Sequence, residues 1–452
     1  MKMSTILTER KVSIMSSNAK HLHSIDAGHY KNTAGCATET MPIPDVVKIS
    51  MSQHIGAPCK PLVAKGDAVK VGQLIGDTDA FVSAPIHSSV SGTVVGIETQ
   101  RSAMGGNDTL VVIETDKKQE MWEGIKVPEV EDLAGFVKAV RDSGLVGLGG
   151  ASFPTHIKYN PRNLDDVHTL ILNAAECEPF ITSDHRTMLE DAQDIIDGMK
   201  LIMKYLNLDE AYVGIEANKP DAIAKLDQMF AEQGLTNMHT FTLQDRYPKG
   251  AERVLVYEIT GKTMNAGVLP ADLGIILSNV TTVAFVGQYF RTGVPLIQKR
   301  MTVDGSAVAQ PKNIIAPIGT MISDVIEFCG GYKEAPKKII MGGPMMGRAI
   351  FSDAMPIVKN NNAILAFAEA QTNIPEETAC INCGRCHHAC PFGLLPTALA
   401  DAYDRRDAEM LSRLQVMQCM ECGSCSFVCP ARRPLGFINK LGKGVVKEAG
   451  IK

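Results

Sequence analysis

The stretch Cys380-Ile-Asn-Cys383-Gly-Arg-Cys386-His-His-Ala-Cys390-Pro391 is repeated, with the same cysteine and proline spacing, as Cys419-Met-Glu-Cys422-Gly-Ser-Cys425-Ser-Phe-Val-Cys429-Pro430. Four cysteine thiolates hold a [4Fe-4S] cluster, and in two-cluster ferredoxins the fourth cysteine of each motif binds the other cluster. The repeat therefore predicts two clusters. Cluster one would be held by Cys380, Cys383, Cys386 and Cys429, and cluster two by Cys419, Cys422, Cys425 and Cys390.

Structural zinc is the alternative for paired cysteines, but it leaves the third and fourth cysteines and the proline of each motif unexplained. His387 and His388 resemble metal ligands, yet eight cysteines already satisfy two clusters. We therefore expect both histidines to be polar residues near the cluster surface. Three cysteines outside the repeat are expected to be small buried residues, namely Cys36, Cys59 and Cys329.

The composition excludes several classes of protein. At 452 residues, with 45% hydrophobic and 21% charged residues, the chain is expected to form about three globular domains. A net charge of -5 and 5% aromatic residues argue against nucleic-acid binding. The clustered cysteines indicate metal ligation in a reducing compartment rather than a disulfide framework. The uncharged run Leu273–Phe290 contains several polar residues, so we expect a buried strand pair there and no membrane span.

The pattern of strand-like and helix-like segments changes three times along the chain and predicts an α/β multidomain protein. Residues 1–120 hold short β-branched runs between glycines and prolines and resemble the biotinyl/lipoyl barrel-sandwich hybrid, but no lysine between Val71 and Asp116 provides a swinging arm. Residues 121–290 alternate helical and strand patterns and predict a Rossmann-like, mostly parallel sheet, with one long helix over Met188–Leu206. A small β-grasp (SLBB-like) insert is expected over 291–360, and an α-helical ferredoxin-like domain over 361–452.

A glycine loop follows the helix expected over Asp132–Ser143. It reads Gly144-Leu-Val-Gly147-Leu-Gly149-Gly150-Ala-Ser-Phe153-Pro-Thr-His-Ile-Lys158. It is no P-loop, and it departs from the dinucleotide fingerprint because no strand leads into it. Its backbone N–H groups could approach a phosphate, Phe153 could stack on a planar ring, and Lys158 adds a positive charge.

In its motifs and their order, from about residue 40 to 440, the chain resembles the RnfC family. These are peripheral components of the Rnf complexes, which are ion-translocating, ferredoxin-linked NAD oxidoreductases. The middle of the chain is similar to the flavin-bearing NADH-binding subunit of respiratory complex I. The resemblance implies an FMN cradle at Gly147, Gly149 and Gly150. Phe153 and Lys158 would lie between the flavin and the nicotinamide nucleotide.

Three further loops match motifs of these relatives and are implied to hold the flavin and NADH. Asn173-Ala-Ala-Glu176-Cys-Glu178-Pro matches NADExEP, Tyr247-Pro-Lys-Gly250-Ala-Glu252 matches YxxGEE, and Asn279-Val-Thr-Thr282 matches NVET. This chain differs from the relatives by carrying Ala175, Ala251 and Thr281 in place of acidic residues. The alternative for the glutamates is a solvated loop charge, and for Cys177 a packed thiol instead of a flavin neighbour. The glycines of Met341-Gly-Gly-Pro-Met-Met-Gly347 are expected to form a turn.

The resemblance implies a peripheral enzyme subunit that exchanges hydride between NAD(H) and FMN and passes single electrons between FMN and two [4Fe-4S] clusters. No catalytic acid or base is required, because the cofactors carry the chemistry. The implied partners are the membrane and ferredoxin-like iron-sulfur subunits of the complex, at the cytoplasmic face of the membrane. A cobalamin-reductase-type flavoprotein and a non-catalytic iron-sulfur conduit are the alternatives.

Overall fold

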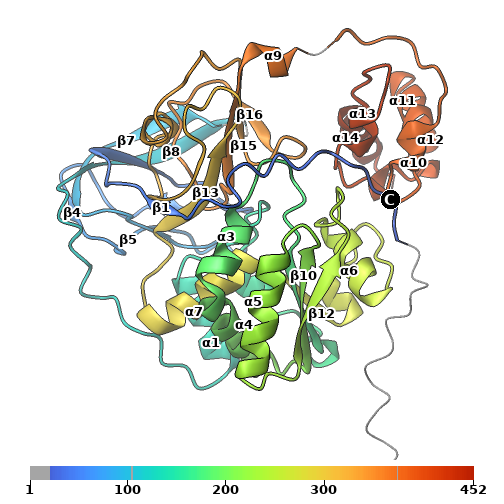
Figure 1. The fold of residues 1–452 in the computed structure, drawn as a ribbon. Helices are drawn as coiled ribbons and strands as arrows, with labels where there is room; N and C mark the ends of the chain where they lie inside the picture. The colour runs from blue at the N-terminus through green and yellow to red at the C-terminus, as the bar shows by residue number, and fades with distance from the viewer. Residues whose placement is uncertain (1–20, 103–104, 374, 452) are drawn as a thin grey trace, which may run out of the picture.

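The computed structural model describes residues 21–102, 105–373 and 375–451. Residues 1–20, which we assigned to the first domain, lie outside this description. Figure 1 shows four units, which we call the barrel, parallel-sheet, β-grasp and cysteine units. The barrel and β-grasp units lie together above the parallel sheet, and the short helices of the cysteine unit form a separate lobe beside them.

The barrel unit is built from two antiparallel sheets that enclose one apolar core. Along the strand Val46–Ser50, Val47 and Ile49 are fully buried, and they pack with Val94 and Val111 across the sheet. The four-stranded sheet has the order β2 (Val46–Ser50), β8 (Asn107–Thr115), β7 (Gly92–Arg101) and β4 (Ala68–Val69), and the three-stranded sheet has β3 (Lys60–Pro61), β5 (Leu74–Asp77) and β6 (Ile86–His87). The barrel-sandwich prediction is therefore confirmed.

The parallel-sheet unit carries four parallel strands in the order β11-β10-β9-β12, as the alternating pattern predicted. The strands are β9 (Thr169–Ala174), β10 (Glu210–Glu216), β11 (Met238–Leu243) and β12 (Ile275–Asn279). Its helices are α1 (Leu133–Asp142), α2 (Thr155–Lys158), α3 (Ser183–Glu190), α4 (Ala192–Leu206), α5 (Pro220–Glu232), α6 (Glu252–Thr260) and α7 (Val280–Thr292), with short 3-10 turns at Leu164–Asp166 and Pro270–Leu273. Because all four strands run the same way, their carboxyl ends meet at one edge of the sheet.

The strand pair expected over Leu273–Phe290 is wrong, because the run forms one strand, β12, and then the helix α7. Helix α7 lacks charge up to Phe290 because most of it is buried against α4. A Cβ atom at Gly198 would lie 2.0 Å from the Val283 carbonyl oxygen, and one at Gly287 would lie 2.1 Å from that of Asp194. The two glycines therefore let the helices approach more closely than any side chain permits.

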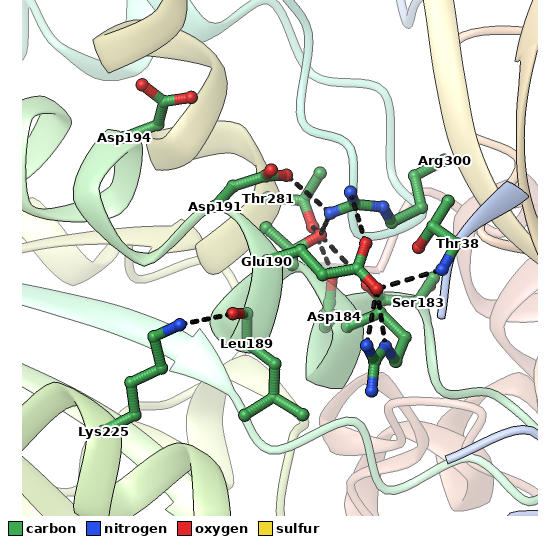
Figure 2. Close-up of polar contacts among 12 residues, drawn as sticks. Thr38, Ser183, Asp184, Leu189, Glu190, Asp191, Asp194, Lys225, Thr281 and Arg300 are labelled. Carbon is green, nitrogen blue, oxygen red and sulfur yellow. Dashed lines mark hydrogen bonds and ion pairs between the residues drawn. The ribbon is translucent and has the colours of Figure 1, made fainter. Parts of the chain in front are cut away.

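The single helix expected over Met188–Leu206 is also wrong, since α3 and α4 are separated at Asp191. This break places two acidic side chains around Arg300, which lies on a strand of the β-grasp unit. The Arg300 guanidinium contacts Asp191 at 2.5 Å and Glu190 at 3.0 Å, and only 8% of the arginine side chain is exposed (Figure 2). Buried charges persist where they are paired, so this contact joins the two units in one arrangement.

The β-grasp unit contains a six-stranded mixed sheet in the order β1-β14-β13-β17-β15-β16, covered by α8 (Ile322–Phe328). Its strands are β1 (Glu39–Thr40), β13 (Gln298–Asp304), β14 (Lys312–Pro317), β15 (Lys338–Met341), β16 (Arg348–Ile350) and β17 (Ala363–Phe367). Strand β17 lies beyond the boundary expected at residue 360. Strand β1 comes from an N-terminal arm, residues 21–40, that runs from the cysteine unit to this sheet (Figure 1).

The two cysteine motifs share their backbone conformation as well as their residue spacing. Gly384 and Gly423, which follow the second cysteine of each motif, have φ angles of 74° and 77° and precede one-turn helices. The helices of the unit are α10 (Arg385–His388), α11 (Pro396–Asp404), α12 (Ala408–Arg413), α13 (Ser424–Phe427) and α14 (Leu435–Glu448), with a 3-10 turn at Val416–Gln418. The short helix α9 (Glu369–Thr372) lies beside the β-grasp unit, before the segment that leads to the cysteine unit (Figure 1). Within the described ranges, no helix has the length and apolarity needed to cross a membrane.

Candidate functional site

The glycine loop rests on the first turn of α7. Gly147 N–H donates to the Phe153 carbonyl at 2.9 Å and closes the loop, while Leu148 N–H donates to Thr282 Oγ1 at 2.9 Å. The Asn279 side chain caps α7 by accepting from Thr282 N–H. A Cβ atom at Gly149 would lie 3.0 Å from Asn279, so glycine is what allows the loop to sit against the cap. The structure thus brings together the predicted residues of two separate motifs.

The outer part of this loop fits a planar, phosphate-bearing cofactor. Gly149 and Gly150 are exposed, and no atom lies within 4 Å of the position of a Gly150 Cβ atom. Gly150 has a φ angle of 131°, which a residue with a side chain rarely adopts. Backbone N–H groups there are open to a ligand beside the start of α7, whose dipole favours a negative charge.

Lys158 lies below the glycine loop, at the carboxyl end of β12. Its Nζ donates to the Leu277 carbonyl at 2.9 Å, and burial lowers the pKa of the amine while the charge of Glu252 opposes that shift. Glu252 is exposed at the start of α6. Two residues singled out in separate motifs, Lys158 and Glu252, therefore lie at the edge of the sheet where the strands end.

Two loops at that edge are tied together by Asn173. Its Nδ2 donates to the Gly250 carbonyl at 2.7 Å, and Gly250 N–H donates to Cys177 Sγ at 3.4 Å. A Cβ atom at Gly250 would lie 3.2 Å from that sulfur. Burial raises the pKa of the Cys177 thiol. Cys177 is thus a packed thiol in the wall of the candidate site.

The two glutamates of the 173–179 loop make specific contacts and are not solvated loop charges. The Glu176 carboxylate accepts from the N–H groups of Asp184 at 2.6 Å and His185 at 3.3 Å, at the start of α3. The Glu178 carboxylate accepts from the N–H groups of Met345 at 2.9 Å and Met346 at 2.8 Å. Glu178 therefore fastens the glycine-rich turn of the β-grasp unit to the candidate site.

Lys31 in the N-terminal arm holds the same loop and was missed by the sequence analysis. Its amine donates to the carbonyls of Glu176, Glu178 and Ile181 at 2.7, 2.9 and 2.7 Å. Burial lowers the pKa of the amine, while the charge of Glu176 opposes that shift. Nothing in the sequence around Lys31 indicates a partner about 150 residues away.

Lys359 and Asn360 bind the start and the middle of the glycine loop and were also missed. The buried Lys359 amine donates to the carbonyls of Gly144 at 2.6 Å and Pro85 at 2.7 Å. The Asn360 side chain donates to the Gly150 carbonyl at 2.8 Å. The barrel and β-grasp units thus help to set the shape of a loop that belongs to the parallel-sheet unit.

Tyr247 connects the candidate flavin loops to the cysteine unit. Its hydroxyl donates to the Cys422 carbonyl at 2.7 Å, and the ring packs in an apolar group with Cys177 and Met345. On the other side, Arg253 donates to the Gln418 carbonyl at 2.9 Å. The two hydrogen bonds reach Cys422 and Gln418, which belong to or adjoin the cysteines predicted to hold cluster two.

Three of the four cysteines predicted for cluster one are neighbours. Burial raises the pKa of the Cys386 thiol, and the Cys429 and Cys380 thiols add to that shift. Cys429 comes from the second motif, as the crossed arrangement requires. The fourth predicted ligand, Cys383, is exposed.

All four cysteines predicted for cluster two are neighbours. Burial raises the pKa of the Cys425 thiol to about 12, and the Cys422, Cys419 and Cys390 thiols add to that shift. The same four residues line one small cavity. Among the residues that the structure describes, no three His, Cys, Asp or Glu side chains form a site for a single metal ion. Four thiols around one cavity are the donor set of a [4Fe-4S] cluster.

Four family models match the chain in the predicted order. They are the RnfC barrel sandwich hybrid domain over residues 23–118, the Nuo51 FMN-binding domain over 140–288, the SLBB domain over 300–349 and the 4Fe-4S dicluster domain over 373–430. The RnfC protein of the proton-translocating ferredoxin:NAD(+) oxidoreductase complex of Clostridium ljungdahlii is 45% identical, over 84% of this chain and 82% of the relative. Its counterpart in the Na(+)-translocating complex of Acetobacterium woodii is 40% identical, over 80% of this chain and 82% of the relative.

The chain belongs to the RnfC family of ion-translocating oxidoreductase complexes. Another member of the family, from Rhodobacter capsulatus, is 38% identical over 93% of this chain and 82% of the relative. A solved NAD+-reducing [NiFe]-hydrogenase in its H2-reduced state shares the fold, with a TM-score of 0.51 and 18% identity over 70% of this chain and 61% of that chain. The fold prediction is thus confirmed, and the chain carries an FMN-binding domain and a 4Fe-4S dicluster domain.

This RnfC chain accommodates its departures from the complex I motifs with local contacts. Thr281 Oγ1 donates to Asp184 at 2.6 Å, and Asp184 also accepts from Asn279 at 2.7 Å (Figure 2 shows the Thr281 contact). The carbonyl of the buried Ala175 accepts from the Lys219 amine at 2.7 Å. Asp184 therefore supplies a carboxylate beside the α7 cap, where the motif expects a glutamate at position 281.

The raised pKa of the Glu178 carboxyl predicts how the free energy of unfolding of this RnfC family member depends on pH. Burial raises the pKa of its carboxyl to about 7, against the opposing effects of the Met345 and Met346 N–H groups, whereas the unfolded chain ionises near 4.5. Between these values the unfolded state releases its proton first, so the free energy of unfolding falls as the pH rises. Urea unfolding at about pH 5 and about pH 7 should show this loss, and Glu178→Gln should reduce it. An equal loss in both proteins would show that other groups cause it.

Proposed function

We propose that this chain is the NAD(H)-linked electron-transfer subunit of a ferredoxin:NAD+ oxidoreductase complex that translocates ions. The observation that carries the proposal is the hydrogen bond from Tyr247 to the Cys422 carbonyl, because it joins the candidate flavin loops directly to a predicted cluster ligand. A nucleotide-binding domain and an iron-sulfur domain that merely shared a chain would not need such a contact.

The residues proposed to hold FMN come from the glycine loop and the start of α7. Bound there, FMN supplies the exchange between a two-electron hydride and single electrons. Gly149 and Gly150 present backbone N–H groups, Gly147 N–H closes the loop on the Phe153 carbonyl, and Asn279 and Thr282 hold that loop in place. Phe153 and Lys158 are proposed to face the flavin and the nicotinamide nucleotide.

The residues proposed to position NAD(H) come from the 173–179 and 247–252 loops. Asn173 and Gly250 fix the two loops to each other. Glu176 and Glu178 shape the first loop through α3 and the β-grasp turn. Glu252 is the exposed acid of the set, so it is free to contact a ribose or an amide.

The contacts also support an order for the clusters. Tyr247, Arg253 and the apolar group around Cys177 touch the surroundings of cluster two. Cluster two is therefore proposed to exchange electrons with the flavin, and cluster one with a partner protein. We further propose that the chain is held at the cytoplasmic face of a membrane by the other subunits of its complex.

Anaerobic purification of the full chain tests the proposed function. The protein should contain about eight irons, as two [4Fe-4S] clusters, and one releasable FMN. Addition of NADH should bleach the flavin absorbance and then reduce the clusters. Iron without flavin would support a non-catalytic conduit instead, and zinc without iron would contradict every electron-transfer function.

A further inference from the structure

A positively charged groove lies beside the cysteines of cluster one, on the side of the cysteine unit that meets the N-terminal arm. Its volume is about 730 Å³, and Cys429, the predicted ligand from the second motif, forms part of its wall. The remainder is lined by the arm at Ser24–Asp26, by Arg246, by residues at the α10 helix and its end, and by residues from the last position of α13 to Arg432. An occupant of this groove would therefore touch a predicted ligand of cluster one.

The charges that line the groove are mostly positive. Arg385 and Arg432 are exposed, and within the described part of the chain neither side chain makes a hydrogen bond or an ion pair. Arg246 also faces the groove and donates to Ser24 Oγ at 3.1 Å. The acidic residue in the lining is Asp26, which accepts from Gly28 N–H at 2.9 Å. Two exposed guanidinium groups are thus left without a partner among the described residues.

The backbone conformation at Arg432 is a further observation on this groove. Arg432 has a φ angle of 58°, and the equivalent position of the first motif is Gly393, with a φ angle of 62°. The chain therefore places an arginine in a conformation where glycine has no steric cost. Two apolar residues beside predicted cluster-one ligands are exposed as well: 48% of Phe427, which lines the groove, and 68% of Ile381, which follows Cys380 in the sequence, are accessible. Arginine with exposed aromatic and aliphatic side chains is the composition of a protein interface.

We propose that this groove is the docking surface for an acidic iron-sulfur protein that exchanges electrons with cluster one. The proposal rests on the proposed function and names the partner's contact site. Carboxylates on the partner would pair with Arg385 and Arg432 and bring the partner's own cluster next to Cys429. A single electron moves from one reduced cluster to the other oxidised cluster, and no bond or proton is exchanged. The unpaired cations would also speed the encounter at low ionic strength.

The test uses the full holoprotein, reduced with dithionite so that it does not depend on NADH. Stopped-flow mixing with an oxidised, acidic two-cluster ferredoxin measures the second-order rate constant of electron transfer. The double variant Arg385→Glu/Arg432→Glu should lower this constant at least about tenfold at low ionic strength, and high salt should remove the difference. The control Arg413→Glu, on α12 and outside the groove, should leave it within about twofold.

An unchanged rate constant in the double variant would overturn the proposal. So would an equal loss in Arg413→Glu, which would reveal an effect of net charge. A small uncharged electron acceptor provides the last control, because a slower reaction with it would place the defect in cluster one and overturn a docking role. Reduction of the wild-type clusters by NADH, measured separately, tests the proposed function, so the two failures are distinguishable.

Discussion

Cys390→Ala should remove cluster two, although Cys390 lies in the first cysteine motif. The Cys390 thiol is a neighbour of Cys419, Cys422 and Cys425, and a [4Fe-4S] cluster is held by four thiolates. About four of the eight irons should be lost. NADH should still bleach the flavin, but electrons should no longer reach cluster one. Iron analysis and low-temperature EPR after NADH addition measure both effects.

Matched variants separate the crossed arrangement from an uncrossed one. Cys425→Ala should give the same EPR spectrum as Cys390→Ala, because both remove a ligand of cluster two. Cys386→Ala and Cys429→Ala should share the other spectrum, in which NADH still reduces cluster two. If Cys390→Ala instead matched Cys386→Ala, each motif would hold its own cluster and the crossed assignment would be wrong.

Lys31→Met should lower the free energy of unfolding by about 3 kcal/mol or more, because an unsatisfied buried acceptor costs about 1–3 kcal/mol and three carbonyls lose their donor. These carbonyls belong to the loop that contains Glu176 and Glu178, so FMN and NADH binding should weaken together with stability. Denaturant unfolding and flavin titration of the apoprotein measure the two effects. The control is Lys65→Met, which removes an exposed lysine from the barrel unit.

Two results would contradict the prediction for Lys31→Met. If Lys31→Met and Lys65→Met unfolded at the same denaturant concentration, the three hydrogen bonds would contribute nothing measurable. If stability fell but flavin and nucleotide bound as in the parent chain, the 176–181 loop would be structural and outside the site.

The features that could be predicted from the sequence are those that short, continuous stretches of residues determine. The grouping of Cys390, Cys419, Cys422 and Cys425 follows from short spacings, and the parallel sheet follows from the alternation of strand and helix patterns along the chain. The predicted FMN loop and the α7 cap, Asn279, also meet in the structure because both carry short motifs. Close helix packing gave the error at Leu273–Phe290, since a helix buried on most sides has no polar face to reveal its period.

The features that could not be predicted depend on partners far apart in the chain. Lys31 and the loop it holds are separated by 145 to 150 residues, and Lys359 and Gly144 by 215. A lysine carries no local sign that its amine will be buried against carbonyls. Arg300 likewise joins the β-grasp unit to the break between α3 and α4, where its acidic partners Glu190 and Asp191 lie.

The N-terminal arm has a consequence for how the protein is made. Residues 21–40 leave the ribosome early, yet Ile25 pairs with Tyr247 and Glu39 pairs with Ile314. The arm must therefore wait until more than 300 residues have been synthesised before it reaches its final place. Until the arm docks, the carbonyls of the 176–181 loop lack the hydrogen bonds from the Lys31 amine. Docking of the arm, a contact between residues far apart in the chain, is then a late folding event, and the 176–181 loop gains its final hydrogen bonds only when the arm docks.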